Sequence, residues 1–192
     1  MRDLDAVIKA YDVRGVYPDD LDEDLARAVG AAFVEVLGIR EEAGGTGAVV
    51  VGRDMRPSGP SLVAAFSDGI TAAGVDVIDI GLCSTDELYY ASGDLGHAGA
   101  MFTASHNPAQ YNGIKLCRPG ALPVGSETGL AEIKGLVAAG WSPPPGPVRG
   151  VVSVRDLRAD YADYLRGLLD LAEMRPLAVV VDAGNGMAGL TA

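Results

Sequence analysis

The sequence has little cysteine and a shortage of positive charge, and each shortage excludes a class of protein. Cys83 and Cys117 are the only two cysteines among 192 residues, and no Cys/His set has the spacing of a zinc site. Both lie in apolar runs, which predicts buried, reduced thiols in a cytosolic protein. The 15 Lys and Arg residues against 26 Asp and Glu residues give a net charge of −11, which argues against nucleic acid and anionic membranes as partners.

Long hydrophobic runs and a leader segment are also missing. No apolar run approaches the ~20 residues of a transmembrane helix. The opening, MRDLDAVIKAYD, is charged and has no apolar core, so we do not expect a secretory signal peptide. These absences favour a cytoplasmic protein. The length and the 48% hydrophobic residues are enough for one good-sized domain, or for one domain and a piece of another.

Short apolar runs alternate with stretches of helical periodicity through most of the chain, which predicts buried strands between amphipathic helices. The strands are expected at 48–51, 75–82, 98–102 and 114–117, and the helices at 21–37, 61–73, 86–93 and 128–139. Ser58 and Thr85 are the expected N-caps of two helices, and a polar loop is expected at 41–47. Strands that alternate with helices predict an α/β layer structure with right-handed crossovers.

The last part of the sequence begins with a connector rich in Pro and Gly, AGWSPPPGPVRG, at 139–150. We expect an extended run at 151–154, a helix at 157–171 and a buried strand, LAVVV, at 177–181. The DAGNGMAG that follows can hold an anion on backbone N–H groups but has no nucleotide-binding fingerprint. The connector therefore predicts a domain boundary, with one domain at 1–150 and a separate segment at 151–192.

The candidate chemistry is concentrated in GAMFTASHNPAQYNGIKL, at 99–116. Pro108 keeps the residue before it out of the helical region, and Asn112-Gly113 predicts a second tight turn before the next strand. A hydroxyl, an imidazole and an ammonium (Ser105, His106 and Lys115) then share one loop between two strands. Loops on a rigid scaffold are where proteins usually place their chemistry.

Three interpretations of Ser105 differ in chemistry. A triad hydrolase is disfavoured, because His106 is the adjacent residue and there is no G-x-S-x-G elbow. A serine that carries phosphate fits better, since a metal ion and Lys115 could hold the added negative charge. The third interpretation is a turn serine that only bends the chain.

Two further segments contain candidate residues. In YDVRG, Tyr11 and Arg14 precede Gly15, an expected turn point, and a guanidinium suits a phosphate group. In GRDMRPS, Arg53 and Asp54 end a predicted strand, where they are either site residues or a structural ion pair. Because loops at strand ends meet at one edge of a sheet, we expect Arg14, Arg53 and Ser105 to approach each other.

TASHNP, YNGIKL, YDVRG, GRDMRPS and the later VVDAGNG resemble the α-D-phosphohexomutases, specifically the phosphomannomutase/phosphoglucomutase branch. The resemblance implies a three-layer α/β/α domain with a mixed sheet, followed by the start of a second α/β domain. It also implies that phosphorylated Ser105 passes its phosphate between the 1- and 6-positions of a hexose through a bisphosphate. The implied catalytic residues are Ser105, His106, Lys115 and Arg14; Tyr11, Arg14 and Lys115 bind the substrate; Asn107, Asn112, Arg53 and Asp54 support the site.

The same resemblance implies Mg²⁺ as cofactor and hexose 1,6-bisphosphate as activator. Ser105 with its phosphate is the one metal ligand expected here, because the aspartate-rich DGDxDR loop of the family is absent from these residues. We therefore expect a phosphorylated hexose as partner and no mutase activity from this chain alone. The segment from Leu157 onward is expected either to pair with another copy in a homodimer or to be poorly ordered.

Two alternatives remain open from the sequence. A phosphoglucosamine mutase has related chemistry, but the YDVRG opening differs from the opening motif of those enzymes. A non-catalytic phosphate- or partner-binding domain could keep the fold without turnover, because a fold does not determine function. Turnover by the full product of the gene discriminates between an enzyme and a binding domain.

Overall fold

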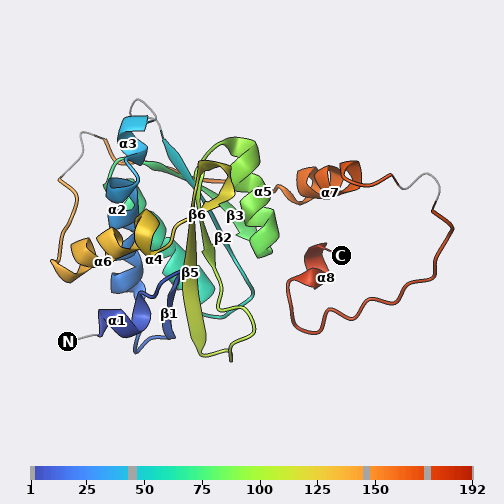
Figure 1. Cartoon of the computed structure of the whole chain (residues 1–192), viewed down its shortest axis with the longest axis horizontal. Coiled ribbons are helices and arrows are strands. Elements are labelled where there is room, and N and C mark those ends of the chain that lie inside the picture. Colours follow the sequence, from blue (N-terminus) through green and yellow to red (C-terminus); the bar gives the residue numbers. More distant parts are fainter. Residues whose placement is uncertain (1–2, 43–46, 145–147, 171–173, 192) are drawn as a thin grey trace.

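The computed structural model describes residues 3–42, 47–144, 148–170 and 174–191. Its centre is a seven-stranded sheet in the order β1-β5-β4-β2-β3-β7, with β6 paired to β5 (Figure 1). The strands are β1 (Val13–Val16), β2 (Ala48–Arg53), β3 (Asp76–Leu82), β4 (Ala98–Phe102), β5 (Tyr111–Arg118), β6 (Leu122–Pro123) and β7 (Val152–Val154). β2 runs parallel to β3 and β4, and β7 runs parallel to β3. β1, β4 and β6 are antiparallel to β5, so the sheet is mixed.

Helices cover both faces of this sheet, with α2, α4 and α6 on one side and α5 on the other (Figure 1). The helices are α1 (Leu4–Val7), α2 (Glu23–Val36), α3 (Ile39–Glu42), α4 (Gly59–Ala72), α5 (Thr85–Leu95), α6 (Leu130–Ala138), α7 (Arg158–Gly167) and α8 (Ala188–Thr191), with 3₁₀ turns η1 (Pro119–Ala121) and η2 (Ser126–Thr128). The expected three-layer α/β/α architecture with a mixed sheet is therefore confirmed.

The larger core lies between the sheet and α2, α4 and α6. Its aromatic centre consists of Phe33, Phe66 and Phe102, whose rings pack in a row with centroids 6.3 and 5.3 Å apart. α2 and α4 approach closely at two glycines. A Cβ on Gly30 would lie 2.4 Å from the Phe66 carbonyl oxygen, and a Cβ on Gly69 would lie 2.1 Å from the Arg27 carbonyl oxygen. The absence of a side chain at both positions lets the two helices pack backbone to backbone.

A smaller core lies between the sheet and α5. It contains Val50, Ile80, Leu88, Met101 and Leu157, together with Cys83. Cys83 and Cys117 are buried and free, as expected from the sequence. Burial raises the pKa of the Cys83 thiol to about 12 and also raises the pKa of Cys117, so both thiols are protonated and unreactive.

The expected turns at Asn112-Gly113 and Gly15 are wrong. Asn112 and Gly113 lie inside β5, and Gly15 lies opposite Asn112 in β1. The turn prediction failed because Gly113 is required for close backbone packing within the sheet and not for a turn. A Cβ there would lie 2.5 Å from the Val13 carbonyl oxygen and 2.8 Å from that of Thr103, so glycine permits close packing of the backbones around it.

Two predicted helix starts differ in detail from the structure. Ser84, rather than Thr85, caps α5, by accepting a hydrogen bond from the Glu87 N–H. Ser58 precedes α4 but makes no side-chain capping bond, because its hydroxyl accepts a hydrogen bond from Asn112 Nδ2 at 2.9 Å. The predicted polar loop at 41–47 begins as the helical turn α3, and residues 43–46 lie outside the described residues.

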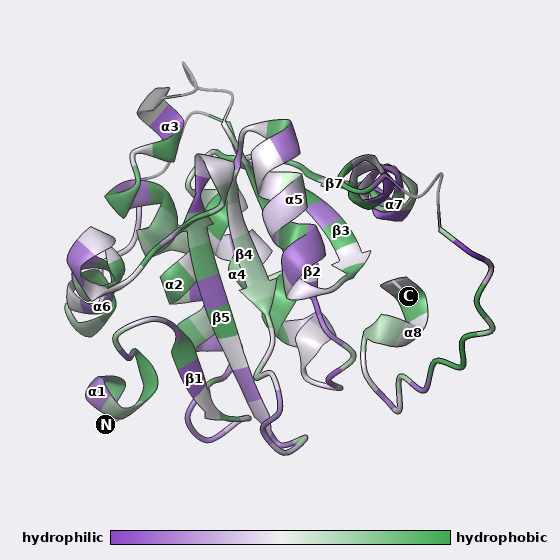
Figure 2. Ribbon diagram, turned by 45° about the vertical axis from the view of Figure 1, so that its right-hand side comes forward, coloured by the Kyte–Doolittle hydropathy of each residue, from purple (hydrophilic) through white to green (hydrophobic). Residues whose placement is uncertain are grey.

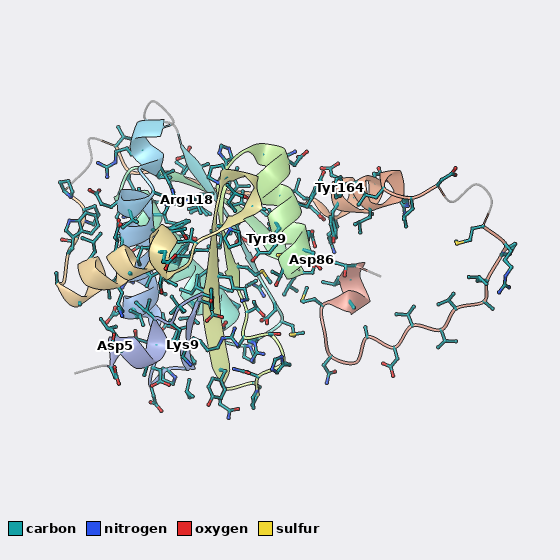
Figure 3. All side chains as sticks on the ribbon, viewed as in Figure 1. Asp5, Lys9, Asp86, Tyr89, Arg118 and Tyr164 are labelled. Carbon is teal, nitrogen blue, oxygen red and sulfur yellow. The ribbon has the colours of Figure 1, made fainter. Side chains whose placement is uncertain are left out.

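The segment that begins at residue 151 first joins the central sheet. β7 pairs with β3, and the buried Leu157 belongs to the smaller core. α7 then packs against α5 through Tyr161 and Tyr164, whose rings lie 5.5 and 5.0 Å from the ring of Tyr90. Figure 3 labels Tyr164 on α7 beside Asp86 and Tyr89 on α5, which line a depression of about 650 Å³ between the two helices. α7 ends at Gly167, earlier than the predicted helix. The domain boundary after residue 150 stays a prediction.

The predicted buried strand at 177–181 is wrong. Residues 174–183 have no regular secondary structure, and Leu177, Val179, Val180 and Val181 are 52, 71, 96 and 61% exposed. Figure 2 shows this hydrophobic stretch running outside the sheet layers. Within the described residues it has no neighbouring strand, and an unpaired apolar run does not form a strand by itself. No helix in the described ranges is long and apolar enough to cross a membrane.

Candidate active site

The Ser105 loop, residues 103–110, connects the C-terminal end of β4 to the start of β5. Ser105 is exposed and has a left-handed backbone with φ of 55°. This conformation costs a non-glycine residue about 1–2 kcal/mol, so the surrounding contacts must maintain it. The Ser105 N–H donates to Thr103 Oγ1 at 2.9 Å, and Ser105 Oγ lies 3.4 Å from Nδ1 of the exposed His106. The loop thus presents a hydroxyl and an imidazole at one end of the sheet.

Two cations from neighbouring strands meet beside this loop. Arg14 Nη2 lies 2.6 Å from Asp12 Oδ2, and Lys115 Nζ lies 3.4 Å from the same oxygen. Arg14 Nη1 also donates to the Ala104 carbonyl at 3.2 Å, which connects β1 to the Ser105 loop. Arg14 Nε is buried without a partner among the described residues. The sequence analysis missed Asp12, although it lies inside the YDVRG motif and holds both cations in place.

Arg53 and Asp54 separate in the structure. Asp54 is 5% exposed and points to the Ser105 loop, where its Oδ2 accepts from Thr103 Oγ1 at 2.7 Å. Arg53 instead lines a separate depression of about 460 Å³ together with Arg149. The Arg–Asp pair considered from the sequence is therefore formed by Arg56, whose Nε lies 3.1 Å from Asp54 Oδ2. Of the three residues expected to meet, Arg14 reaches the Ser105 loop, whereas Arg53 lines the separate depression.

Arg56 is the second residue that the sequence analysis missed. Its guanidinium is 7% exposed and donates four hydrogen bonds of 2.8 Å to backbone carbonyl oxygens of the Ser105 loop and of the first residue of β5. The acceptors are Ser105, Asn107, Pro108 and Tyr111. A sequence signal existed, because Arg56 lies two residues after Asp54 in the turn between a buried strand and a helix. Its contacts across about 50 residues of chain were visible only after folding.

The remaining candidates occupy different environments. Tyr11 is 82% exposed and lies just before β1, open to a ligand or to another segment. Asn112 is fully buried beneath the loop; its Oδ1 accepts from the Gly113 N–H, and its amide binds Ser58. Asn107 contributes its backbone carbonyl to Arg56. Asn107 and Asn112 therefore shape the loop, whereas the Tyr11 side chain is open to solvent.

A complete Mg²⁺ site does not fit the described residues. They contain no group of three or more His, Cys, Asp or Glu side chains placed to hold a metal ion. The two carboxylates beside the loop are engaged, Asp12 with Arg14 and Lys115, and Asp54 with Arg56 and Thr103. Ser105 offers one exposed hydroxyl oxygen, whereas Mg²⁺ requires near-octahedral coordination by several oxygens.

Comparison with known proteins places this geometry in a family. Residues 5–141 match the family model "Phosphoglucomutase/phosphomannomutase, alpha/beta/alpha domain I". The chain is 46% identical over 183 residues to a protein of Xanthomonas campestris pv. campestris named "Phosphohexose mutases", covering 95% of this chain and 39% of that protein. It is 44% identical over 184 residues to an Escherichia coli protein named "Phosphomannomutase", again covering 39% of the relative.

A crystal structure of a phosphoglucomutase/phosphomannomutase family protein from Burkholderia thailandensis matches the whole chain. The TM-score is 0.79 at 39% identity, and the match covers 41% of that structure. This chain thus spans about two fifths of the length of the relatives it matches. With the family model covering most of its residues, the chain belongs to the phosphoglucomutase/phosphomannomutase family and contains the alpha/beta/alpha domain I of that family.

Proposed function

We propose that this chain is the phosphoserine-bearing part of a phosphomannomutase/phosphoglucomutase that interconverts hexose 1-phosphate and hexose 6-phosphate. The observation that carries the proposal is the Ser105 loop. It presents an exposed hydroxyl from a left-handed backbone position, beside His106 and next to the Arg14–Lys115 pair of cations. Family membership at 46% identity supports the same reaction class.

The proposed reaction transfers one phosphoryl group in each direction. A hydroxyl of the sugar phosphate attacks the phosphorus on Ser105, a new P–O bond to the sugar forms, and the P–O bond to Ser105 Oγ breaks. The sugar hydroxyl loses a proton and Ser105 Oγ takes one up. Lys115 and His106 are the proposed proton carriers, because His106 is part of the loop and Lys115 shares Asp12 with Arg14 next to it. Arg14 stabilises the negative charge that develops on the phosphoryl oxygens. The bisphosphate then reorients and returns its other phosphate to Ser105.

Mg²⁺ and hexose 1,6-bisphosphate are the proposed cofactor and activator. Phosphorylated Ser105 would supply one metal ligand, and the other ligands would come from outside the described residues. For this reason we expect no bisphosphate-dependent mutase turnover from the purified 192-residue chain. Turnover by that chain would show that it contains a complete site. The buried free thiols favour the cytosol as the compartment.

The proposed phosphoserine can be tested by labelling. The full-length product of the gene is incubated with hexose 1,6-bisphosphate, and the modified peptide is mapped by mass spectrometry. We expect the phosphate on Ser105 and no label in Ser105→Ala. A phosphate on another residue, or equal labelling of Ser105→Ala, would contradict the proposal. A protein with no label and no turnover would instead be a non-catalytic domain of this fold.

The role of Lys115 can be separated from a structural one. Its side chain is 30% exposed and forms an ion pair with Asp12, so Lys115→Met removes little packing. If Lys115 transfers a proton, turnover by the full-length protein falls about 10²–10⁴-fold. Lys134→Met on α6, which removes the exposed Lys134–Asp5 pair, is the matched control and should keep full turnover. A Lys115→Met enzyme with normal turnover would contradict this role.

We also propose that two copies of the isolated chain pair through the segment after α7. Its apolar residues 177–181 are exposed, and an unpaired apolar run is a template for pairing with another chain. Light scattering on the chain should show a dimer that is lost when the chain is cut after Asp170. A monomer before and after the cut would contradict the pairing.

A further inference from the structure

Four residues form a closed circuit of hydrogen bonds around the backbone of Ser105. The Ser105 N–H donates to Thr103 Oγ1 at 2.9 Å, and the Thr103 hydroxyl donates to Asp54 Oδ2 at 2.7 Å. Arg56 Nε donates to that same carboxylate oxygen at 3.1 Å, and Arg56 Nη2 donates to the Ser105 carbonyl at 2.8 Å. We call these residues (Asp54, Arg56, Thr103 and Ser105) the Ser105 ring.

The ring fixes both backbone groups of the same residue. The N–H of Ser105 is held through Thr103, and its C=O is held by Arg56, so the peptide planes on both sides of Ser105 are restrained. The Ser105 φ of 55° is unfavourable for serine. The two restraints oppose a return of this backbone to a more favourable conformation. The side chain of Ser105 takes no part in the ring and remains exposed.

Three of the four residues of the ring are buried, and two of them connect it to the sheet. Asp54, Arg56 and Thr103 are 5, 7 and 5% exposed. Asp54 and Thr103 directly follow the adjacent parallel strands β2 and β4, where the Asp54 N–H donates to the Phe102 carbonyl at 2.9 Å. The backbone of Ser105 is therefore held by residues at the ends of two central strands, β2 and β4.

The ring differs in net charge from the two cations of the site, Arg14 and Lys115. The Arg56 guanidinium is paired with the Asp54 carboxylate, so the ring as a whole adds no net charge near the Ser105 hydroxyl. All five N–H groups of the Arg56 guanidinium donate to Asp54 or to backbone carbonyls of the Ser105 loop and of Tyr111. Arg56 thus supplies geometry, whereas Arg14 and Lys115 supply positive charge.

We propose that Arg56 is a positioning residue for phosphoryl transfer at Ser105, acting through the Ser105 ring and not through its charge. The inference rests on the proposed mutase function and adds a residue to it. A reacting oxygen displaced by about 1 Å can lose about 10²-fold in rate, so the ring should affect kcat more than substrate affinity.

The decisive variant is Arg56→Lys in the full-length product of the gene. Lysine keeps the positive charge but cannot span Asp54 and four carbonyls at once. We expect kcat to fall about 10²-fold with KM little changed, and we expect Arg56→Met to fall by a similar factor. Arg27→Lys, which alters an exposed arginine bound to Asp24 and Asp68, is the matched control and should have normal kinetics. A normal kcat for Arg56→Lys would overturn the proposal.

Substitutions at Thr103 provide a second test of the ring, which remains available if the Arg56 variants fold poorly. Thr103→Val keeps the branched shape but removes both hydrogen bonds of the hydroxyl, and Thr103→Ser retains them. We expect kcat to fall in Thr103→Val and to be restored in Thr103→Ser, with circular dichroism spectra like that of the unaltered protein. Equal kcat values for the two variants would overturn the proposal.

Chemical rescue distinguishes the guanidinium itself from the bulk of the side chain. Arg56→Gly leaves a space into which guanidinium chloride can bind at concentrations far below those that unfold proteins. We expect guanidinium to restore part of kcat and methylammonium to restore none; equal restoration by both cations would contradict the need for a planar fork. If the unaltered full-length protein neither acquires phosphate on Ser105 nor turns over, the proposed function fails first. If it is active and Arg56→Lys is equally active, the positioning role alone fails.

Discussion

The tetrapeptide AVVV occurs twice in this chain, and its two copies have opposite structures. At 48–51 it forms most of β2, paired with a parallel strand on either side, with its three valines fully buried. At 178–181 it has no regular structure, and Val180 is 96% exposed. The local sequence is the same, so the difference comes from the neighbours that each copy finds. The comparison teaches that an apolar run predicts the need for burial, whereas strand formation requires partners.

The largest expected effect is on the free energy of unfolding, when the third residue of each AVVV run is replaced by aspartate. Val50→Asp places a charge in the smaller core between β2 and α5, which costs more than about 4 kcal/mol and should leave the chain unfolded. Val180→Asp changes an exposed side chain and should shift the free energy of unfolding by less than about 0.5 kcal/mol. Urea denaturation followed by circular dichroism measures both. Equal losses would show that the second copy is buried in solution.

A smaller loss of stability is expected at the border between the packed layers and the exposed C-terminal segment. Leu157 lies just before α7 and is 1% exposed, whereas Leu169 lies just after it and is 64% exposed. Leu157→Ala should therefore cost about 2–4 kcal/mol in urea denaturation, and Leu169→Ala should cost almost nothing. If both substitutions were neutral, β7 and Leu157 would not belong to the first domain's core.

Glycine substitutions sharpen the comparison within the well-packed region. A Cβ on Gly69 would collide with the backbone of α2, so Gly69→Ala should destabilise the chain by about 1–3 kcal/mol. Gly93 on α5 has open space around its Cβ position, and Gly93→Ala should stabilise the chain by about 0.5–1 kcal/mol because alanine favours a helix. The two midpoints of thermal unfolding should move in opposite directions. A common direction would mean that α2 and α4 do not touch at Gly69.

The smallest expected effect depends on pH. Glu87 on α5 is fully buried, neither of its carboxylate oxygens has a hydrogen-bond partner among the described residues, and burial raises its pKa above the usual 4.5. A carboxyl whose folded-state pKa is raised contributes most stability below pH 4.5 and loses that contribution as the pH rises through the folded-state value. Glu87→Gln removes this loss, so the variant should gain stability relative to the unaltered chain near neutral pH and not below pH 4.5.

The exposed Glu132→Gln on α6 is the control for Glu87→Gln, because it removes the same charge without changing a buried group. Its pH profile of unfolding free energy should follow that of the unaltered chain. A Glu87→Gln profile that also follows it would contradict a raised pKa for the Glu87 carboxyl.

Much of the first domain could be predicted because its periodicities are local. The helices α2, α4 and α6 and the strands β2, β3 and β4 lie within a few residues of the expected ranges. The prediction failed at Asn112-Gly113, where a dipeptide typical of a turn lies in the middle of β5. There the close approach of the Val13 and Thr103 carbonyls decides that the residue is glycine, and that approach is not a local property.

The candidate site divides in the same way. Ser105, His106 and Lys115 could be named from the sequence because a recognisable motif contains them, but their roles stay predictions. Asp12 and Arg56 were missed because their importance comes from contacts across about 100 and 50 residues of chain. Arg53 was chosen over Arg56 because GRD resembles a segment of the mutases beside their phosphoserine loop, but in the structure Arg53 lines another depression.

The sequence by itself determined which segments are apolar, where helices and strands alternate, and which loop carries the serine motif, since these depend on residue types and their spacing. Only the tertiary structure decided which of the two AVVV runs became a strand, that Gly113 sits inside β5, and that Asp54 pairs with Arg56. The physical reason is that burial, strand pairing and a guanidinium shared among four carbonyls all require groups that are distant along the chain to meet in space.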